Sequence, residues 1–138
     1  MSAELTKKIA DQVVPMARTL GVQLVDVERD KVVANVPVRE ELSTSPTMMH
    51  GGAIMAVADN LGAIGTVVNM ECGAWTTTLE SKTNFFRAVP VGTTLTAESV
   101  PLHKGRSTQV WQTSLYREDG KLAAIVTQTQ MVLYPDKD

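Results

Sequence analysis

The residue best suited to chemistry lies in the middle of a segment rich in alanine and glycine. Asp59 is the single ionisable residue between His50 and Met70. A carboxylate in such an apolar segment is costly to bury unless it is paired, hydrogen-bonded or used in a reaction. We therefore expect Asp59 to act as a nucleophile or general base. The alternative is a structural carboxylate that binds a neighbouring hydroxyl or faces water.

A second candidate group, His50-Gly51-Gly52, stands where this segment begins. The first N–H groups of a helix have no partner inside the helix, and glycine lets a ligand approach them closely. Gly51 or Gly52 could therefore bind an oxyanion or a carbonyl oxygen; the alternative is a tight corner that needs glycine. His50 is a lone histidine, more often structural than catalytic, and no ligand at metal-binding spacing surrounds it. We expect no metal and no other cofactor.

The two groups are too far apart to act on one carbonyl from a single straight helix. Asp59 follows Gly51 by eight residues, which is about 12 Å along a helix that rises about 1.5 Å per residue. A carbonyl carbon held at the glycine N–H needs its attacking group within about 3–3.5 Å. We therefore predict an active site at a subunit interface, where the glycine end of one chain faces Asp59 of another.

Two polar clusters lie outside this segment. Thr77 stands in a run of three threonines, and one face of that strand could place hydroxyl groups in the cleft, although threonine is also an ordinary strand former. Lys104, Gly105 and Arg106 form a turn whose positive charge favours phosphate groups near solvent; the alternative is a solvated turn without a ligand. Cys72 has no basic neighbour in sequence and is interpreted as a structural or incidental thiol rather than a nucleophile.

The elements that position these residues form an α+β pattern. Apolar residues at helical spacing predict an N-terminal helix over 3–20, which Pro15 should kink or divide and which Gly21 ends. The stretch after His50 contains no proline for about twenty residues and predicts a central helix of about 30 Å. Runs of β-branched residues and period-two patterns predict six strands, namely 22–28, 31–38, 75–87, 93–100, 107–117 and 121–133.

The connections between these elements predict how the sheet is built. Residues 39–49 are expected to be irregular, and short breaks should join the last four strands as hairpins of antiparallel neighbours. Gly62 and Gly65 each cost about 1 kcal/mol relative to alanine inside a helix, so we expect a sheet that curls closely around the central helix. Its exposed edges invite pairing with a second copy, which predicts at least a dimer.

Length and composition set broader limits. A chain of 138 residues is expected to form one domain over 1–138. A net charge of −2 and a pI near 5.7 argue against broad nucleic-acid binding, which needs a basic surface. One cysteine and an N-terminus without the apolar core of a signal peptide predict a cytoplasmic protein. The apolar stretch 52–70 contains Asp59, Asn60 and three glycines, which favours a buried helix over a membrane span.

Several stretches of the sequence resemble the PaaI-like branch of the hotdog-fold thioesterases. They are residues 49–53, residues 58–60 and the strand 77–87, and the resemblance extends over most of the chain. The run 101–112 looks especially like the menaquinone-pathway and enterobactin-proofreading enzymes of that branch. Those proofreading enzymes usually have Glu at the catalytic position, whereas Asp59 is as in the phenylacetate-type enzymes.

The resemblance implies a hotdog fold, in which two subunits form a continuous sheet and dimers commonly pair into tetramers. It implies hydrolysis of an acyl-CoA thioester without a cofactor. The N–H of Gly51 or Gly52 would polarise the thioester carbonyl, and Asp59 would act as nucleophile or as general base for water. His50 matches the family's histidine before the glycines, and Thr77 matches a hydroxyl residue that helps to position water.

Further residues are expected to contact substrate. Thr44 occupies a position, six residues before the histidine, where the family often has Gln or Asn, and its side chain is shorter. Asn60 follows the catalytic carboxylate. The CoA phosphates would lie near Lys104, Gly105 and Arg106.

Two other functions are compatible with the same residues. A non-catalytic acyl-CoA sensor could use the same cleft, because a fold alone does not establish turnover; the carboxylate at Asp59 argues against it. A hotdog hydratase or dehydratase would usually supply a catalytic histidine from a different motif, and the sequence contains no Asp-x-Asn-Pro-x-x-x-His pattern.

Overall fold

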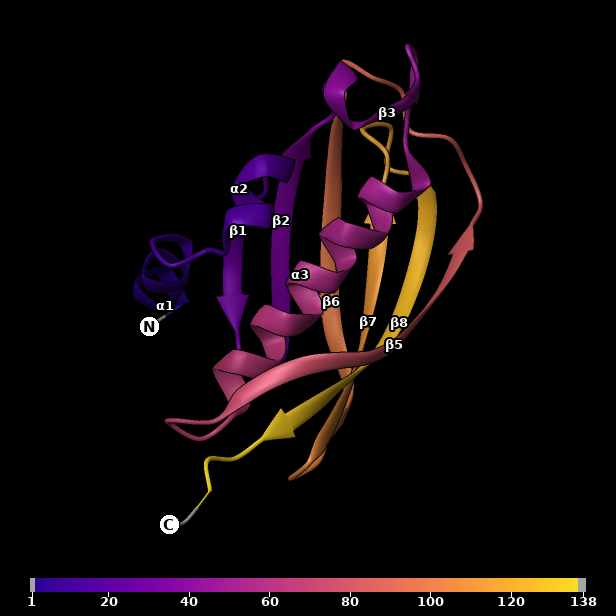
Figure 1. Cartoon of the computed structure of the whole chain (residues 1–138). Helices are drawn as coiled ribbons and strands as arrows, with labels where there is room; N and C mark the ends of the chain where they lie inside the picture. Colours follow the sequence, from indigo (N-terminus) through magenta and orange to yellow (C-terminus); the bar gives the residue numbers. More distant parts are fainter. Residues whose placement is uncertain (1, 137–138) are drawn as a thin grey trace.

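A long helix, α3 (Gly51–Asn69), lies along the concave side of a six-stranded antiparallel sheet (Figure 1). The computed structural model describes residues 2–136. The order of the strands across the sheet is β1-β2-β6-β7-β8-β5, so the predicted α+β architecture is confirmed. The strands are β1 (Gln23–Glu28), β2 (Lys31–Pro37), β5 (Trp75–Phe85), β6 (Thr94–Lys104), β7 (Thr108–Tyr116) and β8 (Leu122–Leu133).

Pro15 divides the predicted N-terminal helix into two. Helix α1 spans Ser2–Ala10, and α2 begins at Pro15 itself and spans Pro15–Leu20. Proline is accepted in the first turn of a helix because the N–H that it lacks would have no partner there. Gly21 ends α2 in the left-handed conformation, with φ of 78°, which glycine adopts without steric cost.

Helix α1 covers the outer edge of β1. The backbone N–H of Val27 donates to the Thr6 hydroxyl at 2.8 Å, and the Ser2 hydroxyl donates to the Asp26 carboxylate. The Ser2 hydrogen bond, opposed by burial and supported by the charge of Lys31, holds the pKa of Asp26 below its ordinary value. One edge of the sheet is therefore closed by a helix, as exposed edges often are.

The connection between β5 and β6 corrects one prediction. These strands are not joined as a hairpin, because β5 pairs with β8 at the opposite edge of the sheet. Residues 86–93 bond instead to the chain before α3, through Met49 N–H to Val89 O and Gly92 N–H to Val38 O, each at 2.8 Å. These bonds carry the chain from the sheet edge to β6. The hairpins β6–β7 and β7–β8 are as predicted, although β6 continues past the predicted end at residue 100.

The segment between β2 and α3 is more regular than predicted. A 3-10 helix (Glu40–Leu42) is followed by two short strands, β3 (Ser43–Ser45) and β4 (Met48–Met49), which pair with each other. The backbone N–H of His50 then donates to Leu42 O at 2.7 Å. This contact holds the chain at the point where α3 begins.

Two glycines of α3 allow the helix to touch the sheet, as predicted. A Cβ atom on Gly65 would lie 2.6 Å from the ring of Trp111, and one on Gly62 would lie 2.3 Å from the amide carbon of Gln128. Trp111 is fully buried, and its Nε1–H donates to Gln109 Oε1 at 3.0 Å. By length and composition α3 resembles a membrane span, but its glycine face fits the polar and aromatic side chains of this sheet.

We predict that Gly65→Ala destabilises the protein. Alanine alone would favour the helix by about 1 kcal/mol, whereas overpacking against Trp111 costs about 1–3 kcal/mol, so the free energy of unfolding should fall by about 1 kcal/mol. Urea denaturation measures it. Trp111→Phe removes the ring atoms that an alanine at position 65 would meet. The double variant should therefore lose less free energy of unfolding than the two single variants lose in sum. An unfolding free energy equal to or above that of the wild type would contradict the packing argument.

Candidate active site

Asp59 presents its carboxylate toward β5 and β8 from the middle of α3. The side chain is half-buried, and its Oδ1 accepts hydrogen bonds from the Thr78 hydroxyl at 2.7 Å and from Gln128 Nε2 at 3.2 Å. All hydrogen bonds that residues 2–136 make to this carboxylate end on Oδ1. The hydroxyl contact expected of a structural carboxylate is thus present on one oxygen, while Oδ2 is left for a ligand or water.

A buried hydrogen-bond network lies beneath Asp59. Gln130 Oε1 lies 2.6 Å from the Thr78 hydroxyl oxygen and accepts from Gln128 Nε2 at 3.0 Å, and Gln130 Nε2 donates to the Thr76 hydroxyl at 3.1 Å. Both glutamines are almost completely buried. Buried polar groups that are fixed in this way hold a side chain in one orientation. The network therefore positions the carboxylate from below.

Sequence reasoning missed Gln128 and Gln130, although β8 carries a signal for them. The inward positions of this strand read Ala124, Val126, Gln128, Gln130 and Val132, and all five are buried. Two glutamines in the inward phase of an apolar strand need polar partners inside the protein. In this chain those partners come from α3 and β5.

Thr78, rather than the predicted Thr77, provides the hydroxyl beside Asp59. Thr77 is exposed on the outer side of β5, because successive side chains of a strand point to opposite faces. The register against β8 shifts directly after Thr78, between Thr78 and Glu80. The run of three threonines correctly predicted the strand that supplies the hydroxyl. The choice of Thr78 over Thr77 depends on which face of the strand meets α3.

The glycine step at the start of α3 has one free and one occupied N–H. His50 is the N-cap residue, and its Nδ1 accepts from Gly52 N–H at 2.7 Å. Residues 2–136 supply no hydrogen-bond partner for Gly51 N–H. The ring of Phe85 packs over Gly51, where an added Cβ would lie 3.1 Å away. Gly51 is thus the better candidate for binding a carbonyl oxygen, and the visible role of His50 is to cap the helix.

The predicted phosphate contacts lie at the other end of α3. Lys104 Nζ forms an ion pair with Asp30 Oδ1 at 2.6 Å and lies 3.4 Å from Asn69 Oδ1, in the last residue of the helix. Gly105 N–H donates to Thr108 O within the turn. The guanidinium of Arg106 is exposed and lies over the ring of Tyr134, 5.7 Å from its centroid.

The other two residues predicted to contact substrate, Thr44 and Asn60, lie in different surroundings. Thr44 lies in β3 and is exposed, without a hydrogen bond to the Asp59 network. Asn60 is half-buried, and its Nδ2 donates to Ala56 O at 2.8 Å, within α3. Among residues 2–136 no group of three or more His, Cys, Asp or Glu side chains is placed to hold a metal ion.

A single chain does not bring the three candidate groups together. Gly51 and Asp59 belong to one helix and are about 12 Å apart along its axis, and Asn69, beside Lys104, is about 27 Å from Gly51. A single chain therefore brings Asp59 next to Thr78, but the Gly51 N–H and the basic turn lie at opposite ends of α3.

An apolar groove of about 160 Å³ lies beside α3, and its lining includes Asn60, the residue that follows Asp59. It separates α3 from α2 and the α1–α2 connection. Asn60 is its one polar residue on α3, and Ala63 follows Asp59 by four residues on the same side of the helix. The residues that line it are Ile9, Gln12, Val13, Val14, Ala17, Asn60, Ala63, Ile64 and Val67.

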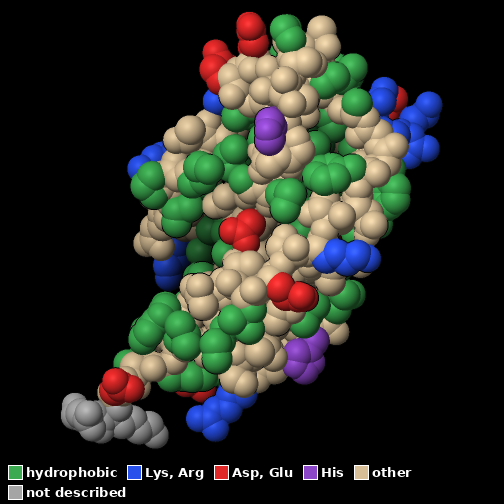
Figure 2. Space-filling model, turned by 45° about the vertical axis from the view of Figure 1, so that its right-hand side comes forward, with side chains coloured by type: hydrophobic (Ala, Val, Ile, Leu, Met, Phe, Trp, Pro, Cys, Tyr) green, Lys and Arg blue, Asp and Glu red, His purple; other side chains and the backbone are tan. Residues whose placement is uncertain are grey.

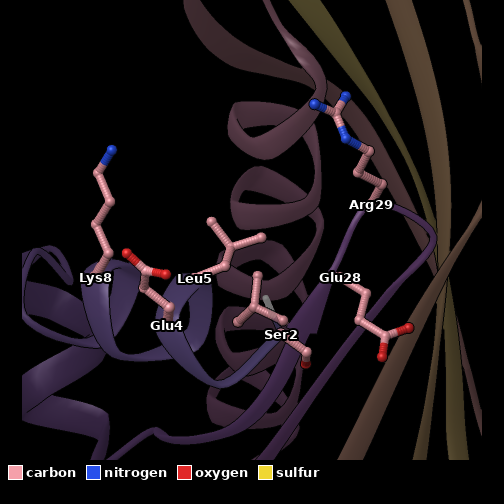
Figure 3. Close-up of a pocket in the computed structure, with 7 residues that line it drawn as sticks. Ser2, Glu4, Leu5, Lys8, Glu28 and Arg29 are labelled. Atoms are coloured by element: carbon pink, nitrogen blue, oxygen red, sulfur yellow. The ribbon is translucent and has the colours of Figure 1, made fainter.

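A larger cavity of about 510 Å³ lies elsewhere, between α1 and the end of β1 (Figure 3). Glu4 and Lys8 of α1 stand on one side of it, and Glu28 and Arg29 stand on the other. None of the residues that line it hydrogen-bonds with Asp59 or with the glutamines beneath. Its size therefore does not make it part of the carboxylate site.

The free edge of the sheet carries several exposed apolar side chains. Among residues 2–136, strand β5 pairs only with β8, and four large side chains on or next to it are about half exposed: Trp75 at 51%, Leu79 at 55%, Phe85 at 52% and Phe86 at 53%. On the face drawn in Figure 2, hydrophobic side chains lie scattered over the surface, with acidic and basic side chains between them. Exposed apolar surface along an unpaired strand is typical of an interface.

Comparison with known proteins gives a consistent result. The model of the thioesterase superfamily matches residues 47–124, more than half of the chain. The 1,4-dihydroxy-2-naphthoyl-CoA hydrolase of Listeria monocytogenes is 32% identical over 80% of this chain and 89% of its own length. A thioesterase structure from Haemophilus influenzae has a TM-score of 0.87 at 25% identity, over 94% of this chain and 90% of that one. The E. coli PaaI structure shows the same fold, with a TM-score of 0.83 at 20% identity, over 94% and 91%.

Proposed function

Since this chain belongs to the thioesterase superfamily and is a thioester hydrolase, we propose that it cleaves acyl-CoA thioesters to a free acid and CoA. The resemblance to the hotdog-fold, PaaI-like thioesterases is confirmed. The observation that carries the proposal is the Asp59 carboxylate, with Oδ1 held by Thr78 and Gln128 and Oδ2 left open. The Listeria relative, named as a hydrolase of an aromatic acyl-CoA, supports the choice of substrate class.

Asp59 can act in two ways with this geometry. Its Oδ2 can attack the thioester carbonyl and expel the CoA thiolate, and water then hydrolyses the resulting anhydride. Alternatively the carboxylate takes a proton from a water molecule that attacks the same carbon. In both cases the carbonyl oxygen gains negative charge, which a backbone N–H stabilises.

We propose that this N–H belongs to Gly51 of a second subunit. The distance of about 12 Å along one helix separates Gly51 from the Asp59 of its own chain. The open edge of β5 and its exposed aromatic side chains support a homodimer in which two sheets continue through β5. The same arrangement would bring the CoA phosphates near Arg106, which is exposed, while Lys104 would exchange its partner Asp30 for a phosphate group.

We propose that the apolar groove beside α3 receives the acyl group. Its lining includes Asn60, which follows Asp59 in sequence, and its volume is about 160 Å³. An apolar protein cavity of about 150 Å³ is known to bind benzene, so the groove has room for one aromatic ring or a short aliphatic chain. Long acyl chains would have to extend past Val67 at the end of the groove.

Asp59→Asn should lower kcat by about 100-fold or more, which is the contribution of a positioned acid or base. Release of free thiol from short-chain, long-chain and aromatic acyl-CoAs measures it. Thr77→Val, on the outer face of β5, serves as the matched control and should leave the rate unchanged.

Three outcomes of this assay would contradict the proposal in different ways. Equal turnover by wild type and Asp59→Asn would remove Asp59 from the mechanism. Tight binding of acyl-CoA without thiol release would indicate a sensor. Loss of enoyl absorbance with an enoyl-CoA would indicate a hydratase.

A shared site predicts complementation between two inactive variants. Asp59→Asn subunits retain the Gly51 N–H, and Gly51→Pro subunits retain the carboxylate but lack that N–H. Each mixed dimer would hold one intact site, so an equal mixture should recover about a quarter of the wild-type activity if chains pair at random. Mixed dimers can be confirmed by mass spectrometry with two tags. Confirmed mixed dimers without recovered activity would show that each site belongs to one chain.

The groove predicts a change of acyl preference in opposite directions for two substitutions. Ala63→Leu narrows the groove, so kcat/KM for a phenylacetyl-CoA should fall relative to acetyl-CoA by about tenfold, the scale of one or two methylene groups in a pocket. Val67→Ala lengthens the groove and should favour an octanoyl-CoA over acetyl-CoA. If neither substitution alters these ratios, the acyl group binds elsewhere.

A further inference from the structure

We propose that Gln128 is a positioning residue, whose side-chain NH₂ group holds the Asp59 carboxylate in place for the reaction. This role rests on the proposed function of Asp59. Gln128 is fully buried on the inward face of β8 and does not reach the open Oδ2 side of the carboxylate, so it would act through Asp59 and Thr78 rather than on the substrate.

The Gln128 amide binds Asp59 at two points. Its Nε2 lies 3.2 Å from Asp59 Oδ1 and 3.3 Å from the backbone carbonyl oxygen of the same residue. A donor that contacts both the side chain and the backbone of one residue fixes the direction of that side chain relative to the helix. Small displacements of a reacting group lower the rate strongly, so this direction matters for catalysis.

The orientation of the amide directs its NH₂ group at Asp59. Gln128 Oε1 is buried and has no hydrogen-bond partner among the described residues, which is costly for an acceptor. Turning the amide over would place Oε1 against three acceptors, namely the carboxylate and the carbonyl oxygen of Asp59 and the Oε1 atom of Gln130. The observed orientation leaves Oε1 unpaired and directs the NH₂ group at the carboxylate, where a hydrogen bond to a charged group is strong.

Gln128 also determines where the Thr78 proton goes. The Thr78 hydroxyl has one proton but two acceptors nearby, Asp59 Oδ1 at 2.7 Å and Gln130 Oε1 at 2.6 Å. Gln128 Nε2 has two protons; one is shared between the two Asp59 oxygens, and the other is directed at Gln130 Oε1, 3.0 Å from the nitrogen. Because Gln128 donates a hydrogen bond to Gln130 Oε1, the Thr78 hydroxyl can donate its proton to Asp59. Without Gln128, Gln130 would compete for the Thr78 proton, and Asp59 would lose both donors.

The backbone of α3 makes room for this amide. A Cβ atom on Gly62 would lie 2.3 Å from Gln128 Cδ and 2.5 Å from both Nε2 and Oε1. Those distances are too short for any side chain at position 62 while the amide keeps its position. Gly62 therefore offers a second way to displace the amide without removing it.

The first test replaces Gln128 by methionine, which has a similar shape and no N–H donor. We expect kcat for acyl-CoA hydrolysis to fall on the order of tenfold to a hundredfold, the loss of a hydrogen bond to a charged group, with KM unchanged. Gln109→Met is the matched control, because Gln109 is equally a buried glutamine but bonds to Trp111 instead of Asp59. It should lower stability and leave kcat per folded molecule unchanged.

The second test uses the two glycines of α3. Gly62→Ala should lower kcat as Gln128→Met does, whereas Gly65→Ala, which presses on Trp111, should affect stability alone. Once Gln128 is replaced by alanine, adding Gly62→Ala should cause no further loss, because the clashing amide is gone. Urea unfolding of every variant gives the folded fraction by which its rate is divided.

Three results would overturn this role. Gln128→Met and Gln109→Met could lower kcat equally, Gln128→Met could raise KM alone, or the effects of Gly62→Ala and Gln128→Ala on kcat could simply add. In each of these cases wild-type hydrolysis and its loss in Asp59→Asn would still support the proposed function. A wild-type protein that releases no thiol from any acyl-CoA would overturn the proposed function, and the positioning role with it.

Discussion

The close contact between α3 and the sheet is the constraint on which the rest of the structure depends. Gly65 admits the Trp111 ring and Gly62 admits the Gln128 amide, so the helix backbone itself touches the inward side chains of β7 and β8. At Gly62 this contact lets the Gln128 amide reach Asp59. A side chain at position 62 would displace that amide from the carboxylate, even if every residue of the network were kept.

The fold could be predicted largely because its signals are local. Helical spacing in 3–20, the small-residue helix after His50 and the alternating strands each depend on neighbours in sequence, and Pro15 divides the first helix for a reason visible in its own chemistry. The strand order could not be predicted in the same way. The position of β5 at the edge depends on bonds between residues 86–93 and the segment before α3, which are distant in sequence.

The candidate site shows the same division between local and distant information. Asp59 stands out because a charge in an apolar segment needs a reason, and Gly51 because it begins a helix. The choice of Thr78 over Thr77 depends on which face of β5 meets α3, a one-residue difference that reverses a strand's faces. Gln128 and Gln130 follow Asp59 by about seventy residues, and only the pairing of β8 beneath the helix reveals that they serve it.

The two edges of the sheet are unlike each other, and this difference limits how copies can assemble. Helix α1 covers the β1 edge, where the Thr6 hydroxyl accepts a hydrogen bond from the N–H of Val27. Among the described residues, no strand pairs with the outer side of β5, which is therefore the bare edge. A sheet with two bare edges could add subunits without end and form a fibre. A sheet with one bare edge is self-terminating: pairing through β5 consumes the open strands of both copies, and no template for a third strand partner is left.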